Sequence, residues 1–137
     1  ERRFNLPLLD KPLGGWAEFV TACVLFDRAL ALVFEAARDS QYEPLRQRAS
    51  KILQEERFHQ MYGKGWLKRM AANAGTRTAM QAAVDRWWTP TVEWIGSGYN
   101  GTLIAEGTLS ESANALRDRW RGEMRSLLSE CGVTIHE

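Results

Sequence analysis

Hydrophobic residues recur along this chain at alternating spacings of three and four, the spacing of one face of an α-helix. The pattern predicts four helices: residues 16–38, 42–72, 77–95, and a last one that starts at the capping-box pattern Thr108–Glu111 and ends before Gly132. No stretch shows a convincing strand pattern, internal repeat or low-complexity tract. The predicted fold class is therefore all-α, a helical bundle.

Short polar or glycine-containing segments separate the predicted helices. The turn at residues 39–41 is short enough to make the first two helices an antiparallel hairpin. Pro90 lies late in the third helix and is expected to kink or split it. Residues 1–15 combine leucines with prolines and glycines, which predicts an extended arm that packs on a neighbouring surface. A chain of 137 residues accommodates one core, so we expect residues 1–137 to form a single domain.

Two ionisable residues interrupt the apolar stripe of the second predicted helix. Glu56 and His59 lie three residues apart, so their side chains leave the helix on the same side. The row that they continue predicts that both point into the core; it consists of Leu45, Ala49, Ile52, Gly63, Trp66 and Met70. Burial of a carboxylate and an imidazole is costly without a partner, and a metal ion would satisfy both.

Asp27 lies within the apolar stripe of the first predicted helix. Bundles that hold two metal ions use a carboxylate from each of two helices and a Glu-x-x-His pair from each of the other two. Asp27, Glu56 and His59 make up half of that set, with donors that suit iron and manganese. Glu55, beside the stripe, is a candidate outer partner or alternate ligand. The remaining histidine, His136, forms no second Glu-x-x-His.

Three explanations would account for a half set of ligands. The other ligands come from a helix pair upstream of this sequence, or from a second chain that meets this one hairpin to hairpin, or the site is degenerate. Without a metal, Asp27 forms a buried ion pair with Arg28 or Arg57, or the three residues hydrogen-bond one another in a plain scaffold. The tryptophans suit a core or a subunit interface better than a substrate pocket; they are residues 16, 66, 87, 88, 94 and 120.

Composition and charge exclude several classes of function. Eighteen basic and seventeen acidic residues are scattered along the chain, for a net charge of +1, so no nucleic-acid surface is expected. Cys23 and Cys131 are too few for a disulfide framework, which favours a reducing compartment such as the cytoplasm. No run is apolar enough to predict a membrane span, and no hydrophobic signal core follows Arg2 and Arg3.

Several segments have an order and spacing that are specific to one family. They are the opening Glu1–Pro12, Leu25-Phe26-Asp27, Glu55-x-x-x-His59, Gly63-Lys-Gly-Trp66-Leu67 and the helix from Met80-Gln81 to Trp88. In this order and spacing the chain resembles the phenylacetic acid catabolism PaaA/PaaC family, and its C-type members most closely. The resemblance covers most of the chain and is strongest from residue 1 to about residue 95.

The resemblance implies a ferritin-like bundle, of which this chain is the second half without the N-terminal helix pair. It also implies membership of a complex that epoxidises the ring of phenylacetyl-CoA, a CoA thioester, with molecular oxygen. In that family, A-type subunits carry the di-iron centre, and C-type subunits are their structural partners.

The same resemblance bears on the candidate ligands. Asp27, Glu56 and His59 match ligand positions of the metal-bearing type, whereas a C-type member keeps counterparts of Asp27, Glu55 and His59 but not of Glu56. We therefore expect a structural partner of a catalytic A-type subunit and of other oxygenase subunits. The alternatives are a di-iron oxygenase subunit in its own right, built with a second copy or with further helices, and a non-catalytic helical scaffold.

Overall fold

The computed structural model describes residues 10, 12–97 and 101–137, so most of the predicted arm, residues 1–15, lies outside the described residues. Its helices are α1 (Trp16–Ala36), α2 (Glu43–Ala71), α3 (Ala74–Trp94), the short α4 (Thr102–Ala105) and α5 (Ala113–Glu130). No strand occurs in the described part of the chain, which confirms the all-α prediction. The arrangement is consistent with part of a ferritin-like bundle. None of these helices is long and apolar enough to cross a membrane.

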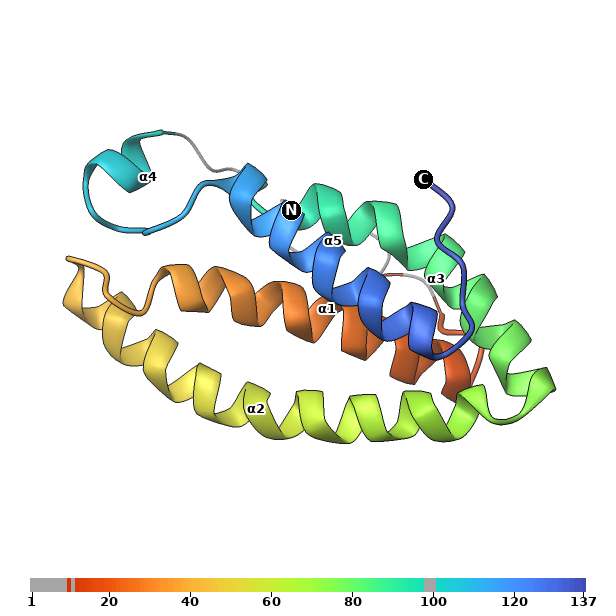
Figure 1. The fold of residues 1–137 in the computed structure, drawn as a ribbon. Coiled ribbons are helices and arrows are strands. Elements are labelled where there is room, and N and C mark those ends of the chain that lie inside the picture. Colours follow the sequence, from red (N-terminus) through yellow and green to blue (C-terminus); the bar gives the residue numbers. More distant parts are fainter. Residues whose placement is uncertain (1–9, 11, 98–100) are drawn as a thin grey trace.

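Helix α1 lies at the centre of the structure. It packs against α2 on one side and against α3 and α5 on the other. In Figure 1, α2 runs antiparallel to α1 along the lower edge, while α3 and α5 lie above α1. The predicted α1–α2 hairpin is therefore confirmed, and α2 is covered mainly by a single neighbouring helix.

Capping side chains define where two of the helices begin. Asn73 accepts hydrogen bonds from the backbone N–H groups of Gly75 and Thr76 at the start of α3. Ser112 caps α5 by accepting from the N–H of Ala115 at 3.1 Å. The predicted capping box at Thr108–Glu111 is thus wrong.

The segment before α5 is held in a loop by other bonds. The N–H of Leu109 donates to the carbonyl of Leu103 at 3.1 Å, and the N–H of Ser110 donates to the carbonyl of Ala36 at 2.8 Å. These bonds tie the segment to α4 and to the end of α1. They hold the segment in a loop, and α5 begins only at Ala113.

Pro90 does not split α3, which continues to Trp94. A proline in a helix removes one backbone hydrogen bond. On either side of Pro90, however, Trp88 and Thr91 are buried, and the Thr91 hydroxyl donates to the carbonyl of Trp87 at 2.7 Å. Packing of this turn against the core keeps it helical.

Three tryptophans form the centre of the core. Trp87, Trp88 and Trp120 are at most 2% exposed, and the Trp120 indole N–H donates to the carbonyl of Leu25 at 2.9 Å. The rings of Trp88 and Trp120 lie 4.6 Å apart between their centroids. This cluster fixes α3 and α5 on α1.

A glycine allows α2 to approach α1 closely. A Cβ atom added at Gly63 would lie 2.5 Å from Cγ2 of Val24, a buried side chain on α1. The turns of α2 just before Gly63 carry Glu56 and His59, so the same close approach sets how far these side chains stand from α1.

We predict that Gly63→Ala destabilises the protein, whereas Gly65→Ala in the same helix does not. Val24 is β-branched and buried, so the clash at Gly63 is expected to cost about 1–3 kcal/mol. A Cβ at Gly65 meets nothing within 4 Å, and alanine there is expected to stabilise the helix by up to about 1 kcal/mol. Chemical denaturation of both variants measures the change in the free energy of unfolding. Equal effects at the two positions would contradict the close packing.

Candidate metal centre

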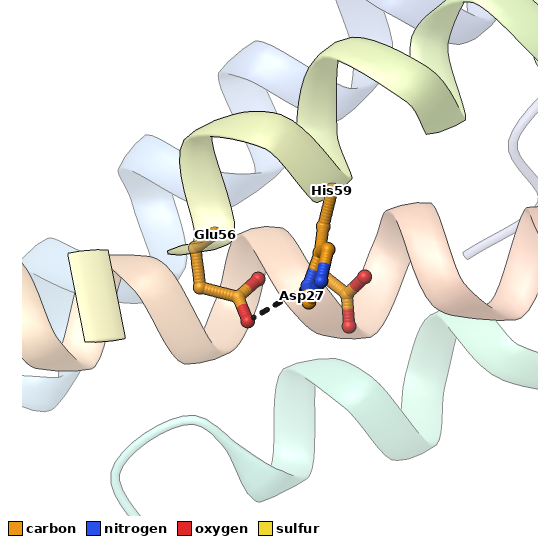
Figure 2. A group of neighbouring side chains, drawn as sticks. All are labelled: Asp27, Glu56 and His59. Atoms are coloured by element: carbon orange, nitrogen blue, oxygen red, sulfur yellow. Dashed lines mark hydrogen bonds and ion pairs between the residues drawn. The ribbon is translucent and has the colours of Figure 1, made fainter. Parts of the chain in front are cut away.

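The contact between α1 and α2 brings the three predicted ligands together. Asp27 comes from α1, and Glu56 and His59 come from α2; one ligand atom from each lies within 4.8 Å of the other two. In Figure 2 the side chains of Glu56 and His59 extend from α2 toward α1, where Asp27 lies. The second histidine lies elsewhere, with Nδ1 of His136 at 3.1 Å from Oδ1 of Asp85.

The three residues differ in burial. Glu56 is buried and Asp27 is half-buried, but the side chain of His59 is 59% exposed. The prediction that His59 points into the core is therefore wrong. Trp66, further along the same predicted stripe, is also exposed, at 38%. Both residues lie on a side of the α1–α2 pair that the described residues leave partly exposed.

The uncovered side continues on α1. Its exposed or half-exposed residues, together called the open flank, are Trp16, Phe19, Asp27, His59 and Trp66. The rings of Trp16 and Trp66 meet edge to face with their centroids 5.5 Å apart, so they join the two helices across this side. Asp27 and His59 thus lie at a partly exposed, largely apolar surface, whereas Glu56 is buried.

Glu56 has one satisfied oxygen and one without a partner. Its Oε1 lies 3.2 Å from Nδ1 of His59, within hydrogen-bonding distance. Its Oε2 is buried and, within the described residues, has no hydrogen-bond partner. A buried carboxylate oxygen without a donor costs free energy, so this atom is a place where a cation would be stabilised.

The pKa of Asp27 is shifted by its burial and by the neighbouring Glu56 and His59. Burial is the main cause that raises the pKa of Asp27 to about 6, and the negative charge of Glu56 raises it further, while His59 acts in the opposite direction. Two carboxylates this close together repel as anions unless a proton or a metal ion is shared between them.

The predicted ion-pair alternative is wrong. Arg28 pairs instead with Glu123 at 2.5 Å and with Glu35 at 2.9 Å. Arg57 is exposed, and among the described residues neither arginine forms an ion pair with Asp27. The charge of Asp27 is therefore not neutralised by a neighbouring guanidinium.

Glu55 is exposed and lies outside the group of three ligand atoms. An apolar pocket of about 110 Å³ beside Asp27 was not predicted; it is lined by Leu13, Phe19, Ala22, Cys23, Phe26, Asp27 and Trp87. The pocket residues that belong to α1 follow the helical spacing around Asp27, and this spacing was the part of the pocket that the sequence could have revealed. Trp87, the lining residue from α3, is brought to the pocket by tertiary packing, which the sequence pattern does not show.

The donor set fits iron or manganese. Two carboxylates and an imidazole are the ligand types that such ions take in helical bundles. The unpartnered Oε2 of Glu56 and the lack of a guanidinium at Asp27, both among the described residues, favour a cation at this place. Three donors fill only part of the coordination shell of such an ion.

The comparisons with known proteins decide the family. The model of the PaaA_PaaC family, described as phenylacetic acid catabolic protein, matches residues 1–137. The chain belongs to this family. It is also similar to the C component of the 1,2-phenylacetyl-CoA epoxidase of Escherichia coli strain K12. The two are 24% identical over 137 residues, which is 98% of this chain and 55% of the relative.

Membership of the phenylacetic acid catabolic protein family confirms the resemblance seen in the sequence segments. The similar protein from Escherichia coli is named as one of the subunits of an epoxidase. The chain spans about half the length of this curated relative. The grouping of Asp27, Glu56 and His59 in space and the family match are the two findings that bear on function.

We predict that Glu56→Gln lowers the pKa of Asp27 in the metal-free protein from about 6 toward the ordinary value of 3.8. The substitution removes the neighbouring negative charge and keeps the shape of the side chain. His59→Ala is expected to raise the same pKa. Carboxyl ¹³C NMR titration measures both shifts, and an Asp27 that already titrates near 3.8 in the unsubstituted chain would contradict the account.

The raised pKa also predicts how stability depends on pH. Asp27 binds its proton more tightly in the folded state than in the unfolded state, where its pKa is near 3.8. The free energy of unfolding of the metal-free protein is therefore expected to decrease as pH rises from about 4 through 6. Asp27→Asn should remove this part of the pH dependence in denaturation experiments. An unchanged profile in that variant would assign the dependence to other groups.

Proposed function

We propose that this chain is part of a structural subunit of a multicomponent oxygenase of the phenylacetyl-CoA epoxidase type, which acts in phenylacetate degradation. The observation that carries the proposal is the similarity to the C component of an epoxidase along 98% of the chain. In this proposal the subunit holds a catalytic A-type subunit, and the assembled complex takes a CoA thioester as substrate. The setting is the cytoplasm.

The open flank supports a role that depends on other helices. Trp16 and Phe19 are 56% and 43% exposed, and they lie on the same side as Asp27 and His59. A large exposed apolar surface is typical of a binding surface. We infer that residues 1–137 form half of a single ferritin-like domain and that a second helix pair covers the open flank.

We predict that the protein forms a stable complex with the catalytic A-type subunit when the two are co-expressed. Size-exclusion chromatography with mass detection of the co-purified proteins measures the complex. A chain that purifies alone from cells that contain the soluble A-type subunit would contradict the structural role.

A second function is favoured by one specific observation, the buried Oε2 of Glu56, which has no partner in the described part of the chain. In this alternative, Asp27, Glu56 and His59 hold part of a di-iron site, and the remaining ligands come from the second helix pair or from a second copy. Iron at this place would supply the electrons for oxygen activation. The residues of this chain would position the metal and, through the apolar pocket beside Asp27, limit the access of water.

We predict, for this alternative, about two irons per assembled site in the full-length protein purified with iron. Glu56→Ala and His59→Ala should each lose the metal, while Glu55→Ala, an exposed neighbour, should keep it. Elemental analysis gives the iron content, and circular dichroism shows that each variant is folded. If the unsubstituted protein contains no iron and all three variants are folded, this alternative is contradicted and the structural role is the proposal that remains.

A further inference from the structure

The segment that follows α5 leaves the helix at a glycine and contacts α3. Gly132 has a left-handed backbone, with φ of 71°, directly after the end of α5. In Figure 1 this dark blue segment turns back past α3. Residues 133–137 are called the strap. Val133 is buried and Ile135 packs against the core, whereas Thr134 and His136 are exposed, so the side chains of the strap alternate between the two sides.

A row of side chains on α3 binds the strap in register. The side chain of Gln81 donates to the carbonyl of Thr134 at 2.6 Å and accepts from its N–H at 2.8 Å. Nδ1 of His136 lies 3.1 Å from Oδ1 of Asp85. Trp88 continues this row, since residues 81, 85 and 88 are four and three apart and share one face of the helix. The strap therefore follows α3 over two turns.

The carboxylate of Glu137 lies in a site built by α3 and α5. The indole N–H of Trp88 donates to Oε1 of Glu137 at 2.7 Å, and Nε of Arg121 lies 3.3 Å from the same oxygen. Arg125 pairs with the other oxygen, Oε2. Trp88 is only 2% exposed, so its indole N–H depends on an acceptor at this place. One buried N–H donor and two guanidinium groups around one acceptor are suited to a carboxylate.

Most contacts of the strap nevertheless lie at the surface. The side chains of His136, Asp85, Arg125 and Glu137 are 67%, 43%, 52% and 37% exposed. Water competes for such contacts, so each contributes little to stability. Segments that are held in this way open locally, at a lower free energy than global unfolding requires.

We propose that the strap opens without unfolding the helices and that its opening frees a carboxylate-binding site formed by Trp88, Arg121 and Arg125. In the closed state, Glu137 occupies this site and holds the strap shut. In the open state, the site takes a carboxylate from an acidic peptide segment. The inference is independent of the proposed oxygenase complex, since it rests only on contacts within this chain.

Hydrogen exchange of the full-length protein, followed by ¹H–¹⁵N NMR, tests the opening. The backbone N–H of Thr134 and the indole N–H of Trp88 should exchange at rates that low concentrations of urea do not change, because opening the strap exposes little surface. The backbone N–H of Leu25, a residue of α1 with 0% exposure, should exchange faster as urea is added, because its exchange requires global unfolding. If Thr134 and Trp88 show the urea dependence of Leu25, the strap is not a separate unit and the proposal is wrong.

A substitution tests the role of the carboxylate. Glu137→Gln should speed the exchange of the Trp88 indole N–H and of the Thr134 N–H at least about tenfold, because a neutral amide binds guanidinium groups more weakly. Thr134 donates to Gln81 rather than to Glu137, so faster exchange there requires the strap to open as one unit. Glu130→Gln is the matched control, since Glu130 is exposed at the end of α5. Equal exchange rates in the two variants would contradict the proposal.

A peptide tests the site itself. A synthetic peptide with the sequence of residues 132–137 and blocked ends should bind the Glu137→Gln variant saturably, at concentrations on the order of millimolar. Binding should move the NMR signal of the Trp88 indole N–H back toward its position in the unsubstituted protein. The control peptide carries glutamine in place of its glutamate and should not bind. Equal binding of the two peptides, or binding of neither, would overturn the assignment of a carboxylate site.

Discussion

The close contact between α1 and α2 is the constraint on which the candidate site depends. The absence of a side chain at Gly63 lets α2 approach Val24, and this approach brings Glu56 and His59 within reach of Asp27. The core tryptophans hold α3 and α5 on the opposite side of α1. The hairpin is thus firmly supported on one side and uncovered, within the described residues, on the other, and the ligands lie at the boundary between the two.

Burial without neutralisation is what distinguishes this site from an ordinary polar cluster. Glu56 has a buried oxygen with no partner among the described residues, and Asp27 has a pKa of about 6. Arg28, the nearest candidate counter-ion by sequence, is engaged by Glu35 and Glu123 instead. A scaffold that only needed to pack would gain stability from apolar residues at these positions. The free-energy cost of burying these carboxylates is offset if a cation, or donors from further helices, complete the site.

Helical periodicity predicted the elements well because it reports directly on which residues of a helix share a face. It also identified Asp27, Glu56 and His59 as one group. It could not show which face another helix covers, and for that reason it wrongly placed His59 in the core. The start of α5 was missed because Ser112 competes with a nearby capping pattern. Long-range contacts leave no local signal: the Gln81 side chain bonds the backbone N–H and carbonyl of Thr134, far along the chain.

The central claim is that the side of α1 and α2 that carries Asp27, Glu56 and His59 is covered in the assembled protein. An electron cryo-microscopy map of the full-length protein in the proposed oxygenase complex tests this most directly. The account predicts helices packed over Trp16 and Phe19, with a donor group or a metal ion at bonding distance from Oε2 of Glu56. A map in which this side faces solvent and Oε2 of Glu56 has no partner would contradict it.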